Sequence, residues 1–177
     1  GIRTEDGVLH ELDVLVLATG FRADRFVRPT TVLGRDGVNL DDVWADHPVA
    51  YLSIAVPGFP NFFMLYGPNT NLGHNSIIFM IECQVRYVMG ALAALADAGE
   101  GAALAVRREA HDEYNERLQA EIDTMIWGHP SIRHSWYRSP SGRIYILSPW
   151  RMVDYWDWTR RPDLAHYEPL VPAPTEL

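Results

Sequence analysis

The segment that most constrains the fold of this chain is residues 12–18, in which nearly every side chain is apolar. A strand that is apolar on both faces is covered on both sides, as in the centre of a sheet flanked by helices or other strands. The segment is short, rich in valine and leucine, and ends in Ala18, Thr19 and Gly20. It predicts a buried central strand and, with the helical patterns further along, an α/β fold.

Turn-forming residues divide much of the remaining chain into short segments. The polar residues 4–7 predict a turn between two strands within residues 2–18. Prolines, glycines and aspartates interrupt the pattern across residues 22–46, where we expect loops. Further short apolar runs predict strands at 51–56, 62–66 and 143–147.

Two long segments have the pattern of helices. Residues 76–97 are apolar on nearly every side, contain no proline and are followed by Gly99, which predicts a buried helix with a glycine cap. Within residues 103–127 apolar side chains recur at helical spacing between charged ones, which predicts an amphipathic surface helix. A short helix is expected over 152–160, and the segment from Pro162 onward should be extended.

The charged residues exclude several classes of function. All fifteen basic residues are arginine, and 23 acidic residues give the chain a formal net charge of −8. Because phosphate binding needs a basic face, a nucleic-acid partner is not expected. The absence of lysine excludes a Walker-A site, a Schiff-base lysine and a Ser–Lys pair.

Cysteine and histidine content argues against a metal site. Cys83 is the single cysteine, so a disulfide framework and a thiolate metal site are excluded, and the histidines lack zinc-site spacing. No apolar run approaches the roughly 18 residues of a membrane span, and the N-terminus lacks a signal-peptide layout. We therefore expect a cytoplasmic location. Gly1 in place of methionine suggests that the chain was cut from a longer one.

Two segments could contact a cofactor. Ala18, Thr19 and Gly20 end the predicted strand with small side chains, so a cofactor could approach the backbone closely, although an ordinary strand end has the same appearance. Residues 67–76 form a loop rich in glycine and asparagine before the long helix. The free N–H groups at such a helix start attract phosphate or carbonyl oxygens, yet Asn75 or Ser76 could equally be a simple helix cap.

A series of short segments follows a known order and spacing. They are 13–21 (Asp-x-x-x-x-Ala-Thr-Gly-Phe), 57–63 (Pro-Gly-Phe-Pro-Asn-Phe-Phe), 65–69 (Leu-Tyr-Gly-Pro-Asn), 74–76 (His-Asn-Ser), 81–84 (Ile-Glu-Cys-Gln) and 135–137 (Ser-Trp-Tyr). In these segments, residues 8–160 resemble the class B flavoprotein monooxygenases, which include the flavin-containing and Baeyer–Villiger enzymes. Each motif is weak evidence alone, whereas their order and spacing together are strong evidence.

The resemblance implies a fold, cofactors and a reaction. Residues 1–160 would be the C-terminal part of a Rossmann-like FAD-binding domain, with a flavin-facing loop and helix at 67–98, and residues 161–177 would form an extended tail. It implies FAD, reduction by NADPH, and insertion of one atom of O2 into an organic substrate, a ketone, through a flavin peroxide. The remaining FAD and NADPH domains of the longer enzyme would be partners. The candidate cofactor-binding residues are Ala18, Thr19, Gly20, Gly67, Pro68, Asn69, Asn75, Ser76 and Trp136.

The chain departs from the family in its glycine motifs. No Gly-x-Gly-x-x-Gly is present, and Gly99-Glu100-Gly101 follows a helix rather than a strand, so we interpret it as a linker. The family's catalytic residues lie upstream of the matched region, so no catalytic residue is assigned. We expect the isolated chain neither to bind FAD tightly nor to oxidise NADPH.

Two other functions stay open at this stage. The chain could be a non-catalytic interaction domain that buries its apolar faces by self-association as a homo-oligomer or against a partner. It could also come from another FAD/NAD(P) oxidoreductase, such as a disulfide reductase. For His74 a structural role is favoured over a catalytic one, and only the resemblance distinguishes Trp136 from the other five tryptophans.

Overall fold

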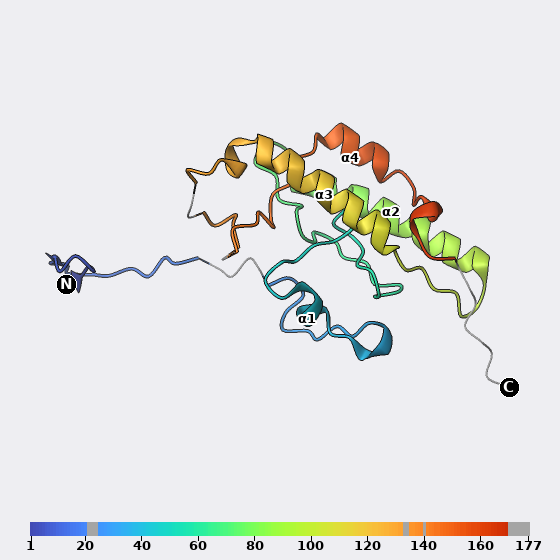
Figure 1. Ribbon diagram of the computed structural model, residues 1–177, viewed down its shortest axis with the longest axis horizontal. Coiled ribbons are helices and arrows are strands. Elements are labelled where there is room, and N and C mark those ends of the chain that lie inside the picture. Colours follow the sequence, from blue (N-terminus) through green and yellow to red (C-terminus); the bar gives the residue numbers. More distant parts are fainter. Residues whose placement is uncertain (21–24, 133–134, 140, 170–177) are drawn as a thin grey trace.

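The computed structural model describes residues 1–20, 25–132, 135–139 and 141–169 of the chain. The α-helices are α1 (Leu40–Trp44), α2 (Ile77–Ala98), α3 (Arg108–Thr124) and α4 (Met152–Trp158). The single-turn 3-10 helices are η1 (Arg35–Gly37), η2 (Ile126–Gly128) and η3 (Leu164–His166). The strands are β1 (Ile2–Arg3) and β2 (Leu9–His10), which pair antiparallel. Helices α2, α3 and α4 lie on one side of the body, and the coil that contains α1 lies on the other (Figure 1).

Helix α2 begins and ends where its sequence predicts. The Ser76 hydroxyl accepts a hydrogen bond from the Phe79 N–H at 3.3 Å, and Gly99 ends the helix with a φ of 92° that favours glycine. The prediction that the whole helix is buried is wrong, because burial is confined to one face. The buried residues of α2 are Met80, Cys83, Gln84, Tyr87 and Ala91.

Helix α3 confirms the predicted amphipathic surface helix, with a later start than expected. Its face toward the core carries Tyr114, Leu118 and Ile122, which are 5%, 0% and 1% exposed. Residues 104–106 are also buried, yet they are coil before the helix. The hydrophobic pattern therefore identified the buried side chains correctly, but it placed the start of the helix about one turn too early.

The expected loop across residues 22–46 contains a helix instead. Asn39 accepts the Asp41 N–H at 3.1 Å and so caps α1, whose Leu40 and Trp44 are buried. The indole N–H of Trp44 donates to the Val49 carbonyl at 2.8 Å. The helix is too short to show a hydrophobic period, and its burial depends on residues further along the chain.

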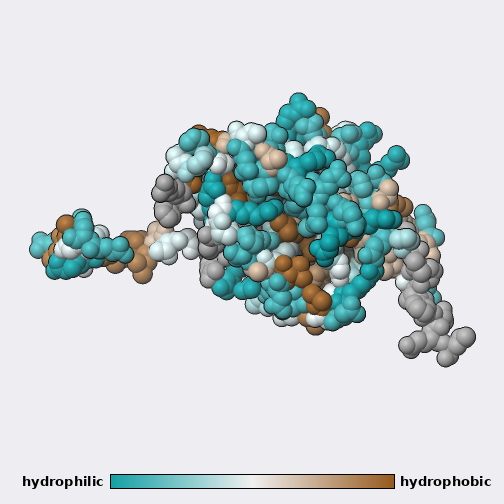
Figure 2. Space-filling model, viewed as in Figure 1, coloured by the Kyte–Doolittle hydropathy of each residue, from teal (hydrophilic) through white to brown (hydrophobic). Residues whose placement is uncertain are grey.

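The predicted central strand at 12–18 is not formed in the structure. These residues form an exposed, extended arm, in which Val14 is 76% and Val16 is 78% exposed. Figure 1 shows the arm leading from the terminal hairpin to the body, and Figure 2 shows its hydrophobic colouring. A strand is stabilised by hydrogen bonds to its neighbours. The one sheet of the described residues pairs β1 with β2 and does not include residues 12–18.

The predicted turn at 4–7 does separate two strands, β1 and β2, whereas the predicted strands at 51–56, 62–66 and 143–147 are coil. Residues 51–56 are buried as a compact turn closed by an antiparallel bridge between Tyr51 and Ala55. Residues 62–66 contribute one hydrogen bond to that turn, from the Met64 N–H to the Ile54 carbonyl at 2.8 Å. The regular secondary structure of the described residues is therefore mostly helical, with one small two-stranded sheet, and the α/β prediction is corrected to this extent.

More of the C-terminal segment packs against the body than the sequence predicts. Helix α4 confirms the short helix predicted at 152–160, and η3 follows it. Tyr167 is 1% exposed, and its hydroxyl lies 2.7 Å from that of Tyr87 in α2. Burial raises the pKa of Tyr167 to about 12. The tail predicted from residue 161 is thus held against the body as far as Glu168, whose N–H donates to the Ala105 carbonyl at 2.8 Å, and residues 170–177 lie outside the described part.

By length and composition α2 could cross a membrane, with a mean hydropathy of 1.5. The prediction that no apolar segment approaches the length of a membrane span is therefore wrong. A single helix of this kind is weak evidence of a membrane span, because the core helices of soluble proteins share these properties.

A buried hydrogen-bond chain joins α2 and α4 and provides a test of this packing. The Tyr155 hydroxyl donates to the Leu52 carbonyl at 2.8 Å and accepts from Gln84 Nε2 at 3.1 Å. Replacing Tyr155 with phenylalanine should lower the free energy of unfolding by about 1–3 kcal/mol, because both partners would stay buried without it. Tyr66→Phe, at a ring 36% exposed, is the control and should change it by less than about 0.5 kcal/mol in urea titrations. Equal effects would contradict the proposed network.

Candidate functional site

The candidate site is built around the loop of residues 67–76. Its first part, Gly67 to Thr70, is buried beside the turn at Ser53. A Cβ atom at Gly67 would collide with the Ser53 carbonyl oxygen, so only glycine allows this approach. The Thr70 hydroxyl donates to the Gly67 carbonyl at 2.6 Å and fixes the bend. The start of the loop is therefore rigid.

Asn69 fastens this loop to the segment at 144–148. Its Nδ2 donates to the carbonyls of Ile144 and Leu147 at 3.1 and 2.9 Å, and its backbone N–H donates to the Tyr145 carbonyl at 2.8 Å. Its φ of 58° lies in the left-handed region, which asparagine tolerates better than most residues. The Oδ1 atom of this side chain is buried without a partner. In the described chain Asn69 thus acts as a structural anchor.

The loop ends at the start of α2. Asn75 Oδ1 accepts the Ser76 N–H at 2.7 Å, and Ser76 caps the Phe79 N–H, so both residues have the cap geometry considered from the sequence. The N–H groups of Ile77 and Ile78 have no acceptor within the helix. Residues 73–76 are exposed. This helix start can therefore receive an electron-rich oxygen atom from outside the chain.

A partly open cavity of about 150 Å³ lies beside the loop. Its lining is Gly73, His74, Ile122, Met125, Trp127, Leu147, Ser148 and Pro149. The Ser148 hydroxyl is buried without a partner, while the Ser148 N–H donates to the Asn71 carbonyl at 2.9 Å. His74 stands at the surface edge of this mostly apolar space.

Trp136 lies at the surface of an aromatic group. Its ring is 52% exposed and meets that of Tyr137 edge-on at 5.4 Å, and Tyr137 in turn meets Trp127 at 4.9 Å. The Trp136 carbonyl accepts the Tyr145 hydroxyl at 3.2 Å. Since Trp127 also lines the cavity beside the loop, the tryptophan segment and the loop belong to one region.

The predicted strand end is not brought to this region. Ala18, Thr19 and Gly20 are exposed on the arm, away from the loop (Figure 1). Phe21, which completes the motif, lies outside the described residues. The structure thus unites the loop, the α2 start and the Trp136 segment, and leaves Ala18 to Gly20 apart.

Sequence reasoning missed two residues that shape the site. Gln84 in α2 accepts the Tyr66 N–H at 2.7 Å, immediately before the loop, and is fully buried. A glutamine on the apolar side of a predicted helix was the available signal, because a buried amide requires partners. Ser148 carried no sequence signal.

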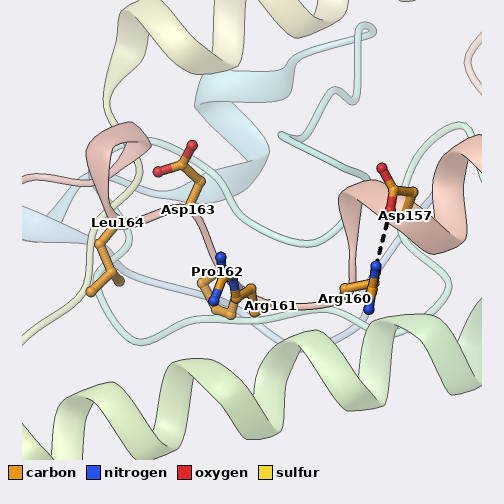
Figure 3. A pocket seen from close by; sticks show the side chains of 6 residues that line it. All are labelled: Asp157, Arg160, Arg161, Pro162, Asp163 and Leu164. Atoms are coloured by element: carbon orange, nitrogen blue, oxygen red, sulfur yellow. Dashed lines mark ion pairs between the residues drawn. The ribbon is translucent and has the colours of Figure 1, made fainter.

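A larger hollow of about 880 Å³ lies at the loop after α4 (Figure 3). Two of its charged groups are engaged with each other, since Arg160 Nη1 lies 3.6 Å from Asp157 Oδ1, and the Arg160 guanidinium stacks 5.0 Å from the Trp156 ring. Pro162 there packs closely against Gly90 of α2. None of the candidate residues lines this hollow, so it is not part of the site.

Two glycines of the loop provide a matched pair of variants. Gly67→Ala should lower the free energy of unfolding by about 1–3 kcal/mol, because the new methyl group would overlap backbone. Gly73→Ala should be nearly neutral, since its Cβ would lie 4.0 Å from the nearest atom, in the Trp127 ring. Urea unfolding of both variants tests this, and equal stability would refute the close approach at Gly67.

Comparison with known proteins identifies relatives for almost the whole chain, although no family model matches it. An uncharacterized monooxygenase of Sinorhizobium fredii is 41% identical over 99% of this chain and 27% of its own length. A Baeyer–Villiger monooxygenase of Pseudomonas aeruginosa is 40% identical over 94% of the chain and 32% of its own length. The closed structure of cyclohexanone monooxygenase matches 98% of the chain and 33% of its own, with 31% identity and a TM-score of 0.73. The chain, which spans about a third of the length of these relatives, is homologous to a region of the FAD-binding and Baeyer–Villiger monooxygenases.

Proposed function

We propose that this chain is part of an FAD- and NADPH-dependent monooxygenase that inserts one atom of O2 beside the carbonyl of a ketone. The observation that carries the proposal is the position of residues 67–76, a loop that is fixed at its start and ends at the capped N-terminus of α2, whose first N–H groups are free. Homologues that bind FAD and NADP support it, and one cyclohexanone monooxygenase structure contains cyclohexanone.

The residues at the start of α2 fit a flavin. When bound, FAD would supply the redox chemistry, accepting reducing equivalents from NADPH and reacting with O2. The chain's own contribution is electrostatic: the N–H groups of Ile77 and Ile78 and the helix dipole favour an oxygen that gains negative charge. Ser76 keeps these donors in place by capping the next N–H group.

Trp136 would contact the nicotinamide nucleotide. Half of its ring is exposed, while its backbone is fixed by the Tyr145 hydroxyl. An exposed aromatic face on a fixed backbone can stack against a planar ligand at a small entropy penalty. It would therefore orient the dinucleotide rather than take part in bond formation.

The remaining FAD and NADPH domains of such an enzyme are the proposed partners. Val14 and Val16 on the arm and Ile78 and Met89 on α2 are large apolar side chains exposed by 60% or more. Covering such apolar surface with protein removes it from water, which is favourable by about 25 cal/mol per Å² buried. The arm would become the central strand predicted from its sequence once neighbouring strands supply hydrogen bonds.

The first test uses the 177 residues alone. We expect the purified chain to retain no FAD after gel filtration and to oxidise NADPH no faster than buffer, because it has no glycine motif for the pyrophosphate. A yellow protein that consumes NADPH would overturn this expectation.

The second test replaces the homologous region of the Pseudomonas aeruginosa relative with this chain. The chimera should retain FAD and oxidise NADPH, with ketone-dependent product formation. In this chimera Trp136→Ala should raise the KM for NADPH about tenfold or uncouple NADPH use from product formation, because ring stacking is worth about 1–3 kcal/mol. Glu121→Gln, an exposed change on α3, is the control. An FAD-bound Trp136→Ala chimera with unchanged KM and coupling would restrict Trp136 to packing.

A further inference from the structure

A tyrosine–histidine pair joins the turn at 51–56 to η3. The Tyr51 hydroxyl oxygen lies 2.6 Å from Nδ1 of His166, and the two rings meet edge-on at 5.6 Å between centroids. Tyr51 is 6% exposed, and no other described residue hydrogen-bonds with its hydroxyl. A buried O–H needs an acceptor, so Tyr51 donates to Nδ1, and His166 carries its own proton on Nε2. The proposed monooxygenase function uses neither residue.

His166 is held in position through its backbone. Its N–H donates to the Asp163 carbonyl at 3.1 Å, and its carbonyl accepts the Arg107 N–H at 2.9 Å. The residue is half-buried and borders a second, partly open hollow of about 290 Å³. An imidazole accepts a proton near neutral pH, whereas a carbonyl or hydroxyl oxygen does not. Nδ1 is therefore a fixed base at hydrogen-bond distance from the Tyr51 proton.

Three other buried tyrosines have hydroxyl partners that are not bases. The hydroxyls of Tyr87 and Tyr167 lie 2.7 Å from each other, and Tyr155 donates to the Leu52 carbonyl at 2.8 Å. A phenol that loses an electron becomes a strong acid, and a buried site penalises the charged form that results unless the proton leaves. Tyr51 is therefore better placed than these three tyrosines to lose an electron.

A series of aromatic rings in contact connects Tyr51 to the surface. The Tyr51 ring meets that of Tyr114 at 5.7 Å between centroids. Tyr114 meets Trp150 at 6.3 Å, and Trp150 meets Trp158 at 5.1 Å. The indole N–H of Trp150 also donates to the Tyr114 hydroxyl at 3.2 Å, and both tryptophans are half-buried. Contact between π-systems favours electron transfer, so an electron from Tyr51 can reach the surface at Trp158.

The charge beside the tryptophans favours Tyr51 as the residue that stays oxidised. The guanidinium of Arg117 lies 5.7 Å from the ring centroid of Trp150 and 5.4 Å from that of Trp158. An oxidised tryptophan gains positive charge, which this cation repels. Oxidised Tyr51 gains no charge, because its proton passes to His166.

The hollow beside His166 favours the imidazolium that this transfer forms. Its other charged members are the carboxylates of Glu113 and Asp163 and the guanidinium of Arg117, two negative charges against one positive, which leaves a net charge of −1. An excess of negative charge nearby stabilises a protonated imidazole. Burial raises the pKa of Tyr51, so its hydroxyl keeps its proton until an electron is lost.

We propose that Tyr51 and His166 form a redox-active pair that gives one electron to a one-electron oxidant, such as an oxygen-derived radical, at the surface of the chain. The electron leaves through the aromatic series, and the oxidant is reduced by one electron. The O–H bond of Tyr51 breaks as an N–H bond forms at Nδ1 of His166. The products are a neutral tyrosyl radical and an imidazolium. Return of one electron, from a reductant such as ascorbate, sends the proton back and restores both residues.

Flash oxidation of the full 177-residue chain tests the proposal. Ruthenium tris(bipyridine), illuminated in the presence of persulfate, supplies a one-electron oxidant, and transient absorption follows the tyrosyl radical. Tyr51→Phe keeps the ring and should remove most of the long-lived signal. In the wild-type chain the signal should form more slowly in D2O than in H2O, because an O–H bond breaks as the electron leaves. A wild-type signal in Tyr51→Phe, or equal rates in the two solvents, would overturn the proposal.

His166→Gln separates the base from the hydrogen bond. The glutamine carbonyl can still accept from the Tyr51 hydroxyl, but it cannot take the proton at neutral pH. We expect the Tyr51 radical to form at least about tenfold more slowly, since a positioned base contributes about 10²–10⁴-fold. His129→Gln, at an exposed histidine outside the pair, is the control and should keep the wild-type rate. A folded His166→Gln chain with the wild-type rate would show that His166 does not take the proton.

Discussion

The buried amide of Gln84 is the interaction on which the arrangement of this chain most depends. Its Oε1 accepts the Tyr66 N–H, and its Nε2 donates to the Tyr155 hydroxyl, which donates in turn to the Leu52 carbonyl. One side chain of α2 thereby holds α4, the turn at Leu52 and the entry to the candidate loop. Because a sheet is absent from the described body, these side-chain bonds take the place of a backbone ladder. The buried hydroxyl stays protonated, since burial raises the pKa of Tyr155 well above its ordinary value.

The helices could be predicted from the sequence because their signals are local. The limits of α2 follow from a serine cap and a terminal glycine, and the inner face of α3 follows from the spacing of Tyr114, Leu118 and Ile122. Helix α1 escaped prediction because five residues contain too little periodicity. Strands differ physically, since their hydrogen bonds go to other segments. The apolar run at 12–18 has the composition of a central strand, but the described residues supply no partner for it.

For the candidate site, the sequence could single out segments but not their internal bonds. The order of motifs made the loop at 67–76 and the Trp136 segment candidates, and the structure places both segments near Trp127. The sequence could not reveal that Asn69, a candidate cofactor residue, donates its side-chain N–H groups to the carbonyls of Ile144 and Leu147.

The exposed side of α2 raises the question of what covers it. Ile78, Val85 and Met89 form an apolar stripe along this side, and Glu82 lies within the same stripe. In a bilayer a charged side chain near the centre of the helix is costly, and for Arg86 it would amount to about 2.5–3.5 kcal/mol. Arg86 instead donates to the Trp156 carbonyl at 2.8 Å and stacks on the Trp156 ring, an arrangement that depends on α4. A stripe that combines apolar side chains with a carboxylate suits a protein surface, which can supply a polar partner for Glu82, better than lipid.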